Sequence, residues 1–162
     1  MTVGSHQNEA ALGGPSLTAR LGRVLDQQTE LYQRLDALAQ QQSSHIDQGE
    51  AEQLIGVLAQ RQIVIDEIAR LNEELRPVQE RWSATADEVS EDERQQIRRR
   101  TEALSELIHS IGRRDEADRA RLERHRDAVR GEIRKSNQAK SAAAAYGGPR
   151  GPVSPRYQDR DA

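Results

Sequence analysis

The sequence predicts an all-α protein, an elongated antiparallel helical hairpin followed by a long third helix in a coiled-coil-like three-helix bundle. Two observations lead to this prediction. Apolar residues recur at heptad spacing over stretches long enough for helices of many turns. The hydrophobic residues are almost all aliphatic, because the chain has no Phe, one Trp and three Tyr. So few bulky side chains suit narrow helical seams better than the interior of a globule.

The first helix is expected over residues 16–42, with Ser16 as its N-cap. The apolar residues that follow alternate steps of four and three, which is a heptad seam. They are Leu17, Leu21, Val24, Leu31, Leu35 and Leu38, with Gln28 filling the one gap. Asp47 and Gly49 then predict a turn, in which Asp47 is a candidate cap for the next helix. Residues 1–15 are small and polar and are predicted to be disordered.

The second helix is expected over residues 50–76, and its apolar stripe is wider than that of the first. The stripe contains Leu54, Ile55, Leu58, Ile63, Val64, Ile65, Ile68, Leu71 and Leu75. This width predicts contact with two neighbours, and the short connection before the helix favours an antiparallel hairpin. Pro77 lacks an amide donor and is expected to end the helix, with Trp82 covering the edge of the bundle.

The third helix is expected over residues 91–145. It begins at a capping box formed by Ser90 and Glu93. Its first half carries a clean seam, from which Leu104, Ile108 and Ile111 are expected to join the internal core. The other seam positions are Ile97 and Thr101, with Leu107 beside them.

The second half of this helix is more polar, and the seam is predicted to fail between residues 113 and 121. Asp115 and Asp118 stand there at positions where apolar residues would fall. Leu122, Val129 and Ile133 then resume a sparser stripe. Too little apolar surface remains for full burial, so this half is expected to await a partner, either a client helix or a second copy of the chain.

The sequence lacks the residue patterns that several functional classes require. There is no Cys, and the four His (His6, His45, His109 and His125) have no metal-ligand spacing, so no metal or other cofactor and no enzymatic activity are predicted. The net charge of −3 and the interleaved charges of residues 91–140 argue against nucleic acid. No signal peptide or membrane span is recognisable, which predicts a cytoplasmic protein without membrane insertion.

The stretch "DEADRA", from Asp115 to Ala120, has the D-x-x-D-x-A form found at the coiled-coil tip of transcription factors resembling DksA. In those factors the tip enters the secondary channel of RNA polymerase. Here the match lies within a continuous helical stretch, and the zinc-ribbon cysteines are absent. A polymerase-channel regulator is therefore a remote alternative, beside a structural coiled-coil protein that self-associates and has no client.

Taken together, these elements resemble the flagellar export chaperones of the FlgN type over roughly Leu17 to Gly151. The resemblance includes the turn "HIDQGEAEQL", the helix "LAQRQIVIDEIARL" and a Tyr-Gly pair near the C-terminus. Arg61 before the aliphatic cluster of residues 63–65 fits a basic position of the family. A later family pattern, an acidic or amide residue followed three places on by Asn, would fall on Asp115 and Asp118, so the Asn is missing.

The resemblance implies a cytoplasmic chaperone for late flagellar export substrates. It would bind the C-terminal helices of hook-associated proteins at the hook–filament junction, keep them unassembled and bring them to the export gate. The related FliT-type chaperones serve the filament cap protein, and the two roles are not separated here. The client-binding residues would be Leu122, Val129 and Ile133, and Tyr146 at the start of the Gly- and Pro-rich tail, residues 146–162, would dock on the export gate. Homodimerisation is left open.

Overall fold

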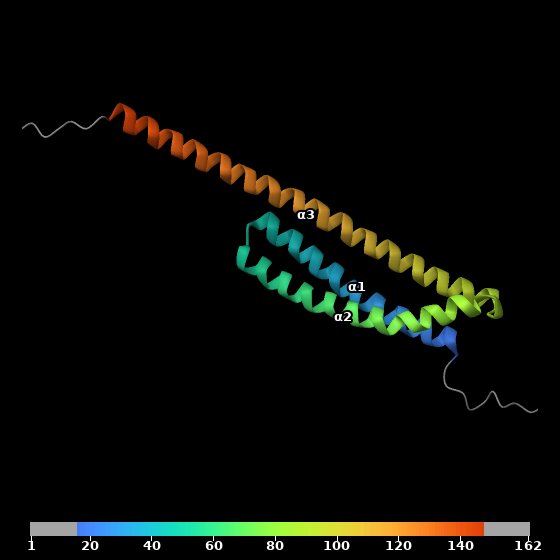
Figure 1. Ribbon diagram of the computed structural model, residues 1–162. Helices are drawn as coiled ribbons and strands as arrows, with labels where there is room; N and C mark the ends of the chain where they lie inside the picture. The colour runs from blue at the N-terminus through green and yellow to red at the C-terminus, as the bar shows by residue number, and fades with distance from the viewer. Residues whose placement is uncertain (1–15, 148–162) are drawn as a thin grey trace, which may run out of the picture. The chain divides into compact units, whose positions relative to one another are not determined.

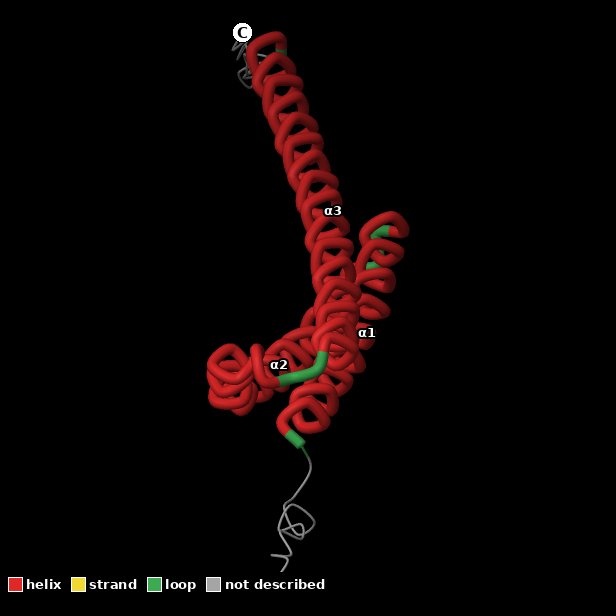
Figure 2. The backbone as a smooth tube through the Cα atoms, turned by 90° about the vertical axis from the view of Figure 1, so that its right-hand side faces the viewer, coloured by secondary structure: helices red, strands yellow, loops and turns green. Residues whose placement is uncertain are grey.

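The computed structural model describes residues 16–147, and within them the chain is helical apart from short connections (Figure 1). The helices are α1 (Leu17–Gln48), α2 (Ala51–Thr85) and α3 (Glu91–Tyr146), with a short 3₁₀ helix, η2 (Ala86–Glu88), before α3. No strand is present among the described residues, and Figure 2 shows helix and loop alone in them. The predicted all-α class is thus confirmed. Residues 1–15, predicted to be disordered, and residues 148–162 of the predicted tail lie outside the described residues. Tyr146, predicted to begin the tail, is instead the last residue of α3.

The chain divides into two units between Arg119 and Ala120, a boundary that lies within α3. The first unit contains α1, α2, η2 and the part of α3 up to Arg119. The second contains the C-terminal segment of α3, residues 120–146. The core described below belongs entirely to the first unit, whereas the predicted client-binding residues belong to the second.

The core of the first unit consists of two apolar clusters along the hairpin. One cluster lies toward the turn between α1 and α2 and is built from Leu35, Leu38, Ala39, Val57, Val64, Ile68 and Ile111. The other lies toward the opposite end and contains Leu21, Leu25, Leu75, Val78, Ile97 and Leu104. Tyr32 packs against both clusters, and this burial raises the pKa of its phenol above the ordinary value. Trp82 is half-buried against the second cluster, at the edge of the core as predicted.

The gap in the heptad seam at Gln28 is filled by a polar contact between the two helices of the hairpin. Gln28 is buried and its Nε2 donates a hydrogen bond to Asn72 Oδ1 at 2.6 Å. A buried amide needs such a partner, because an unpaired polar group inside the core would cost stability. The contact separates the two apolar clusters along the hairpin.

α1 continues six residues beyond its expected end at Gln42. Tertiary contacts hold the extra turns, because Ser43 and Ile46 are both buried. The turn itself is formed by Gly49, whose φ of 69° lies in the left-handed region that favours glycine. Asp47 belongs to α1, and α2 has Glu50 at its N-cap without a side-chain capping bond, so the prediction that Asp47 caps α2 was wrong.

α2 also exceeds its expected end, because the helix passes through Pro77 and ends at Thr85. Proline removes one backbone hydrogen bond and typically costs about 3 kcal/mol inside a helix. Here Leu75 and Val78 on either side of it are buried in the core, and this packing offsets the lost bond. In Figure 1 the α2 ribbon is bent in its C-terminal part.

The predicted caps of the first and third helices are confirmed. The Ser16 hydroxyl accepts a hydrogen bond from the Ala19 amide at 3.1 Å. At the start of α3, the Glu93 amide donates to Ser90 Oγ and the Ser90 amide donates to Glu93 Oε2, both at 3.3 Å. This reciprocal pair is the capping box that the sequence indicated.

Candidate functional site

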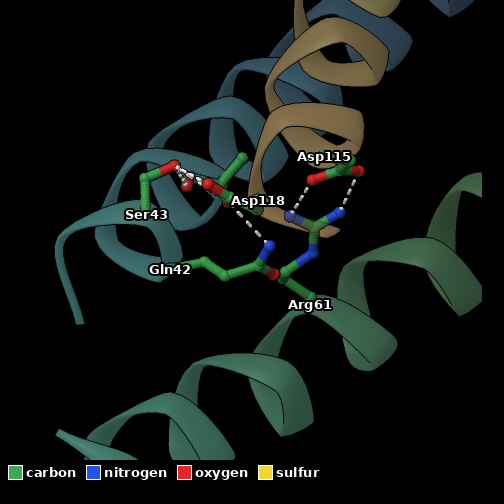
Figure 3. A network of polar contacts seen from close by, with 6 residues as sticks. Gln42, Ser43, Arg61, Asp115 and Asp118 are labelled. Atoms are coloured by element: carbon green, nitrogen blue, oxygen red, sulfur yellow. Dashed lines mark hydrogen bonds and ion pairs between the residues drawn. The ribbon is translucent and has the colours of Figure 1, made fainter. Parts of the chain in front are cut away.

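An ion pair joins α2 to α3 at a level where α3 has no apolar residue on its seam. Arg61 Nη1 and Nη2 donate to Asp115 Oδ1 and Oδ2 at 2.8 and 2.7 Å, a bidentate arrangement (Figure 3). The Arg61 side chain is nearly buried, with 10% of its surface exposed, whereas the Asp115 side chain is 37% exposed. The guanidinium group of Arg61 therefore lies on the core side of α2 and pairs with the carboxylate of Asp115 on α3.

A second polar contact joins α1 to α3 beside this pair. Asp118 is 1% exposed, and its carboxylate accepts hydrogen bonds from Gln42 Nε2 and Ser43 Oγ, each at 2.9 Å (Figure 3). The Ala39 carbonyl, 3.2 Å from Ser43 Oγ, is a second acceptor within reach of the same hydroxyl proton. We call the five residues Gln42, Ser43, Arg61, Asp115 and Asp118 the polar layer.

The polar layer corrects the prediction that the seam of α3 fails at residue 113. The buried residues of α3 are Ile97, Leu104, Ile111 and Asp118, each seven residues after the one before. The heptad thus continues through Asp118, but its last position is polar and is matched by polar residues on the hairpin. Ile108, predicted to lie in the core, is instead 39% exposed, whereas Leu104 and Ile111 are buried as predicted.

The heptad spacing of the sequence could have predicted this layer. Gln42 stands seven residues after Leu35, and Arg61 stands seven residues before Ile68, so both occupy seam positions. Asp115 and Asp118 are also the acidic residues of the D-x-x-D-x-A stretch. Both contact the hairpin within the first unit, Asp118 as a buried residue and Asp115 as a partly exposed one, so they are engaged in intramolecular contacts and do not form a free tip.

The C-terminal segment of α3 carries the residues predicted to bind a client. Leu122, Val129 and Ile133 are 44%, 53% and 55% exposed. On a helix with 3.6 residues per turn they fall within about 40° of one another, so they form one narrow line. We call this line the apolar stripe of the C-terminal segment.

Tyr146 is the last residue of α3 and is 94% exposed. The helix closes just beyond it, where the Gly147 amide donates to the Ala143 carbonyl at 2.8 Å. An aromatic ring is thus presented to solvent at a helix end, where it makes no contribution to a core.

A second exposed apolar surface lies on α2 and was not predicted as such. Ile55, Leu58 and Ile65 are 68%, 48% and 40% exposed, and we call them the outer stripe of α2. The wide apolar face of α2 was expected to contact two helices. Its core side does so, with Val57, Val64 and Ile68 buried, but the outer stripe and Ile63 remain exposed in the described part of the chain.

Two features are absent from the described residues, a metal-binding group and a membrane-spanning helix. Residues 16–147 contain no group of three or more His, Asp or Glu side chains placed to hold a metal ion. No helix within this range combines the length and the apolarity that a bilayer crossing requires. The fold and these surfaces therefore define an all-α protein whose candidate site is a set of exposed apolar helix faces.

The chain belongs to the FlgN family. The family model described as "FlgN protein" matches residues 17–153, which is most of the sequence. No curated protein and no solved structure is significantly similar to the chain. Membership supports the general role of a flagellar export chaperone, a non-enzymatic class of proteins that bind flagellar proteins.

Proposed function

We propose that this chaperone works in the cytoplasm and binds the C-terminal helices of hook-associated proteins. Binding would keep these proteins from assembling prematurely and bring them to the export gate. Leu122, Val129 and Ile133 form the client-binding surface in this proposal, and Tyr146 docks the complex on the gate.

The observation that carries the proposal is the exposure of the apolar stripe on the C-terminal segment. Three large aliphatic side chains lie on one side of a helix, and roughly half of each is in contact with water. An amphipathic client helix laid along this stripe would bury them, and burying an aliphatic side chain is typically worth about 1.5–3 kcal/mol. The stripe thus supplies anchors at the spacing that helix-to-helix recognition uses.

The experiment is a binding titration of the full chain with the C-terminal segment of a hook-associated protein. We predict that Leu122→Gln/Val129→Gln/Ile133→Gln weakens binding at least about 10-fold, because it removes the apolar anchors. Gln is a good helix former, so circular dichroism should give an unchanged helix content.

The matched control is Ile55→Gln/Leu58→Gln/Ile65→Gln on the outer stripe of α2. It removes three aliphatic side chains of comparable exposure and should leave the affinity within about twofold. Loss of binding in this control, with the first variant unaffected, would move the client site to α2. Absence of any flagellar export protein after capture with the wild-type chain would overturn the proposal as a whole.

Tyr146→Ala should separate delivery from client binding. The ring is almost fully exposed and contributes no packing, so helicity and client affinity are expected to remain unchanged. Secretion of the client into the medium should fall while its cytosolic level rises, as measured by immunoblotting of both fractions. If client affinity falls instead, Tyr146 belongs to the client surface and its assignment to the export gate is wrong.

One observation favours a second candidate, a coiled-coil protein that self-associates. The outer stripe of α2 is as exposed as the stripe of the C-terminal segment and is not used in the client proposal. Sedimentation of the client-free chain discriminates the two, because self-association through α2 predicts a dimer that Ile55→Gln/Leu58→Gln/Ile65→Gln dissociates. A monomer would remove this candidate.

A further inference from the structure

The C-terminal segment of α3 is strongly basic, unlike the chain as a whole. Residues 120–146 contain seven Lys or Arg against three Asp or Glu, an excess of four positive charges, whereas the full chain carries a net charge of −3. We propose that the client helix is acidic beside its apolar positions, and that Arg130 and Arg134 select it. This inference rests on the proposed function and specifies the chemistry of its partner.

Three arginines form a line along one side of the apolar stripe. Arg126, Arg130 and Arg134 are spaced by four residues, so on a helix they follow one another along the axis. Arg130 and Arg134 line a shallow surface hollow together with Ile133, which places two positive charges beside an apolar anchor. On the other side of the stripe the helix carries Arg121, His125 and Glu132, where the charges of Arg121 and Glu132 offset each other. The positive charge beside Ile133 therefore comes from Arg130 and Arg134.

Arg130 and Arg134 are available to a partner. Within residues 16–147 neither forms an ion pair. Arg126 differs, because it contacts the adjacent Asp127 at 3.4 Å, a long contact between side chains that are 57% and 65% exposed. The two unpaired arginines are therefore the selecting residues, and an acidic side chain could pair with them without breaking an existing contact.

The outer stripe of α2 has the opposite charge beside it. Glu52 and Asp66 are the exposed charged residues next to Ile55 and Ile65, and the nearby Arg61 is buried in its pair with Asp115. An acidic amphipathic helix would meet repulsion on α2 and attraction on the C-terminal segment. The two stripes expose similar apolar side chains, so the sign of the neighbouring charges is what distinguishes them for an acidic partner.

Nucleic acid and anionic membranes are the other partners that a basic helix can bind. The apolar stripe favours a helix over nucleic acid, because three aliphatic side chains need an apolar partner to be buried. Single-stranded nucleic acid is in addition bound by stacking aromatics, and residues 120–146 offer Tyr146 alone, at the end of the helix. The three-residue stripe is also short for a membrane-surface helix, which typically presents a broad apolar face with Trp, Phe or Leu.

The experiment measures the affinity of the full chain for two designed amphipathic peptides by fluorescence anisotropy. Both have the same apolar heptad positions and about 20 residues, enough to form a helix. One carries Glu beside the apolar positions and the other carries Lys. We expect the Glu peptide to bind about 10-fold more tightly at low salt, and the difference to shrink at about 1 M salt, where the Debye length is only about 3 Å.

Charge reversal at the two arginines provides the specific variant. Arg130→Glu/Arg134→Glu should remove or reverse the preference for the Glu peptide. The control is Arg98→Glu/Arg99→Glu, which makes the same charge change at two exposed residues of α3 in the first unit and should preserve the preference. Equal affinity of the wild-type chain for both peptides would overturn the inference, as would tighter binding to a DNA duplex or to phosphatidylserine vesicles than to the Glu peptide.

These outcomes can be separated from failure of the proposed function. If Leu122→Gln/Val129→Gln/Ile133→Gln abolishes binding of a hook-associated protein while the two designed peptides bind equally, the client surface stands and only its charge selectivity is lost. If the hook-associated protein does not bind but the Glu peptide does, the surface takes acidic helices and the client assignment is wrong.

Discussion

Asp118→Ala is expected to lower the free energy of unfolding by about 3 kcal/mol. The substitution removes an acceptor that is 1% exposed, and it leaves the Gln42 amide buried without that partner. Ser43 is less affected, because its hydroxyl proton can then be donated to the Ala39 carbonyl. Urea denaturation followed by circular dichroism and by Trp82 fluorescence would measure the loss, since Trp82 lies against the second apolar cluster.

Asp127→Ala is the matched control for this measurement. It makes the same Asp-to-Ala change in the same helix and gains the same helix propensity, but the Asp127 side chain is 65% exposed. Its unfolding free energy should stay within about 0.5 kcal/mol of wild type. A similar small effect for Asp118→Ala would mean that the contact between α3 and α1 contributes nothing to the stability of the first unit.

Arg61→Met is expected to cost about 2 kcal/mol of unfolding free energy. Methionine keeps the aliphatic stem of the buried side chain but removes both hydrogen bonds to Asp115. The cost is smaller than that of a fully buried ion pair, because Asp115 is 37% exposed and can regain water. The same urea titration measures it.

The double variant Arg61→Met/Asp115→Leu tests whether the contributions of Arg61 and Asp115 to the unfolding free energy depend on each other. Replacing both partners by apolar residues leaves no unpaired charge, so most of the stability lost in Arg61→Met should return. If the double variant is instead as unstable as the sum of the two single changes, the residues act independently and the bidentate pair is not coupled in solution.

The polar layer gives α3 a defined axial position on the hairpin within the first unit. Aliphatic seams tolerate a shift of one heptad, because Leu and Ile pack against one another in either register. A shift of α3 by seven residues would separate Asp118 from Gln42 and Arg61 from Asp115, leaving buried polar groups unpaired. The layer therefore disfavours the shifted arrangement, as a buried polar residue does in a coiled coil.

The candidate site was predicted in part by local pattern alone. Leu122, Val129 and Ile133 were recognised because the residues around them are polar, and the structure leaves all three exposed. Their role as a client surface stays a prediction. The outer stripe of α2 was missed as an exposed surface, because Ile55 was assigned to the same wide stripe as Val64. At 3.6 residues per turn the nine residues between them place the two on opposite sides of the helix, and Val64 is the one that faces the core.

The sequence by itself determined the helical class, the capping at Ser16 and Ser90, and the similarity to the FlgN family, because heptad spacing and caps depend on residues close together in the chain. Only the tertiary structure decided that α1 and α2 extend beyond Gln42 and Pro77, and that Arg61 and Asp118 are core residues. The physical reason is that a helix end or a buried charge is stable only with a partner, and these partners stand as many as 76 residues away along the chain.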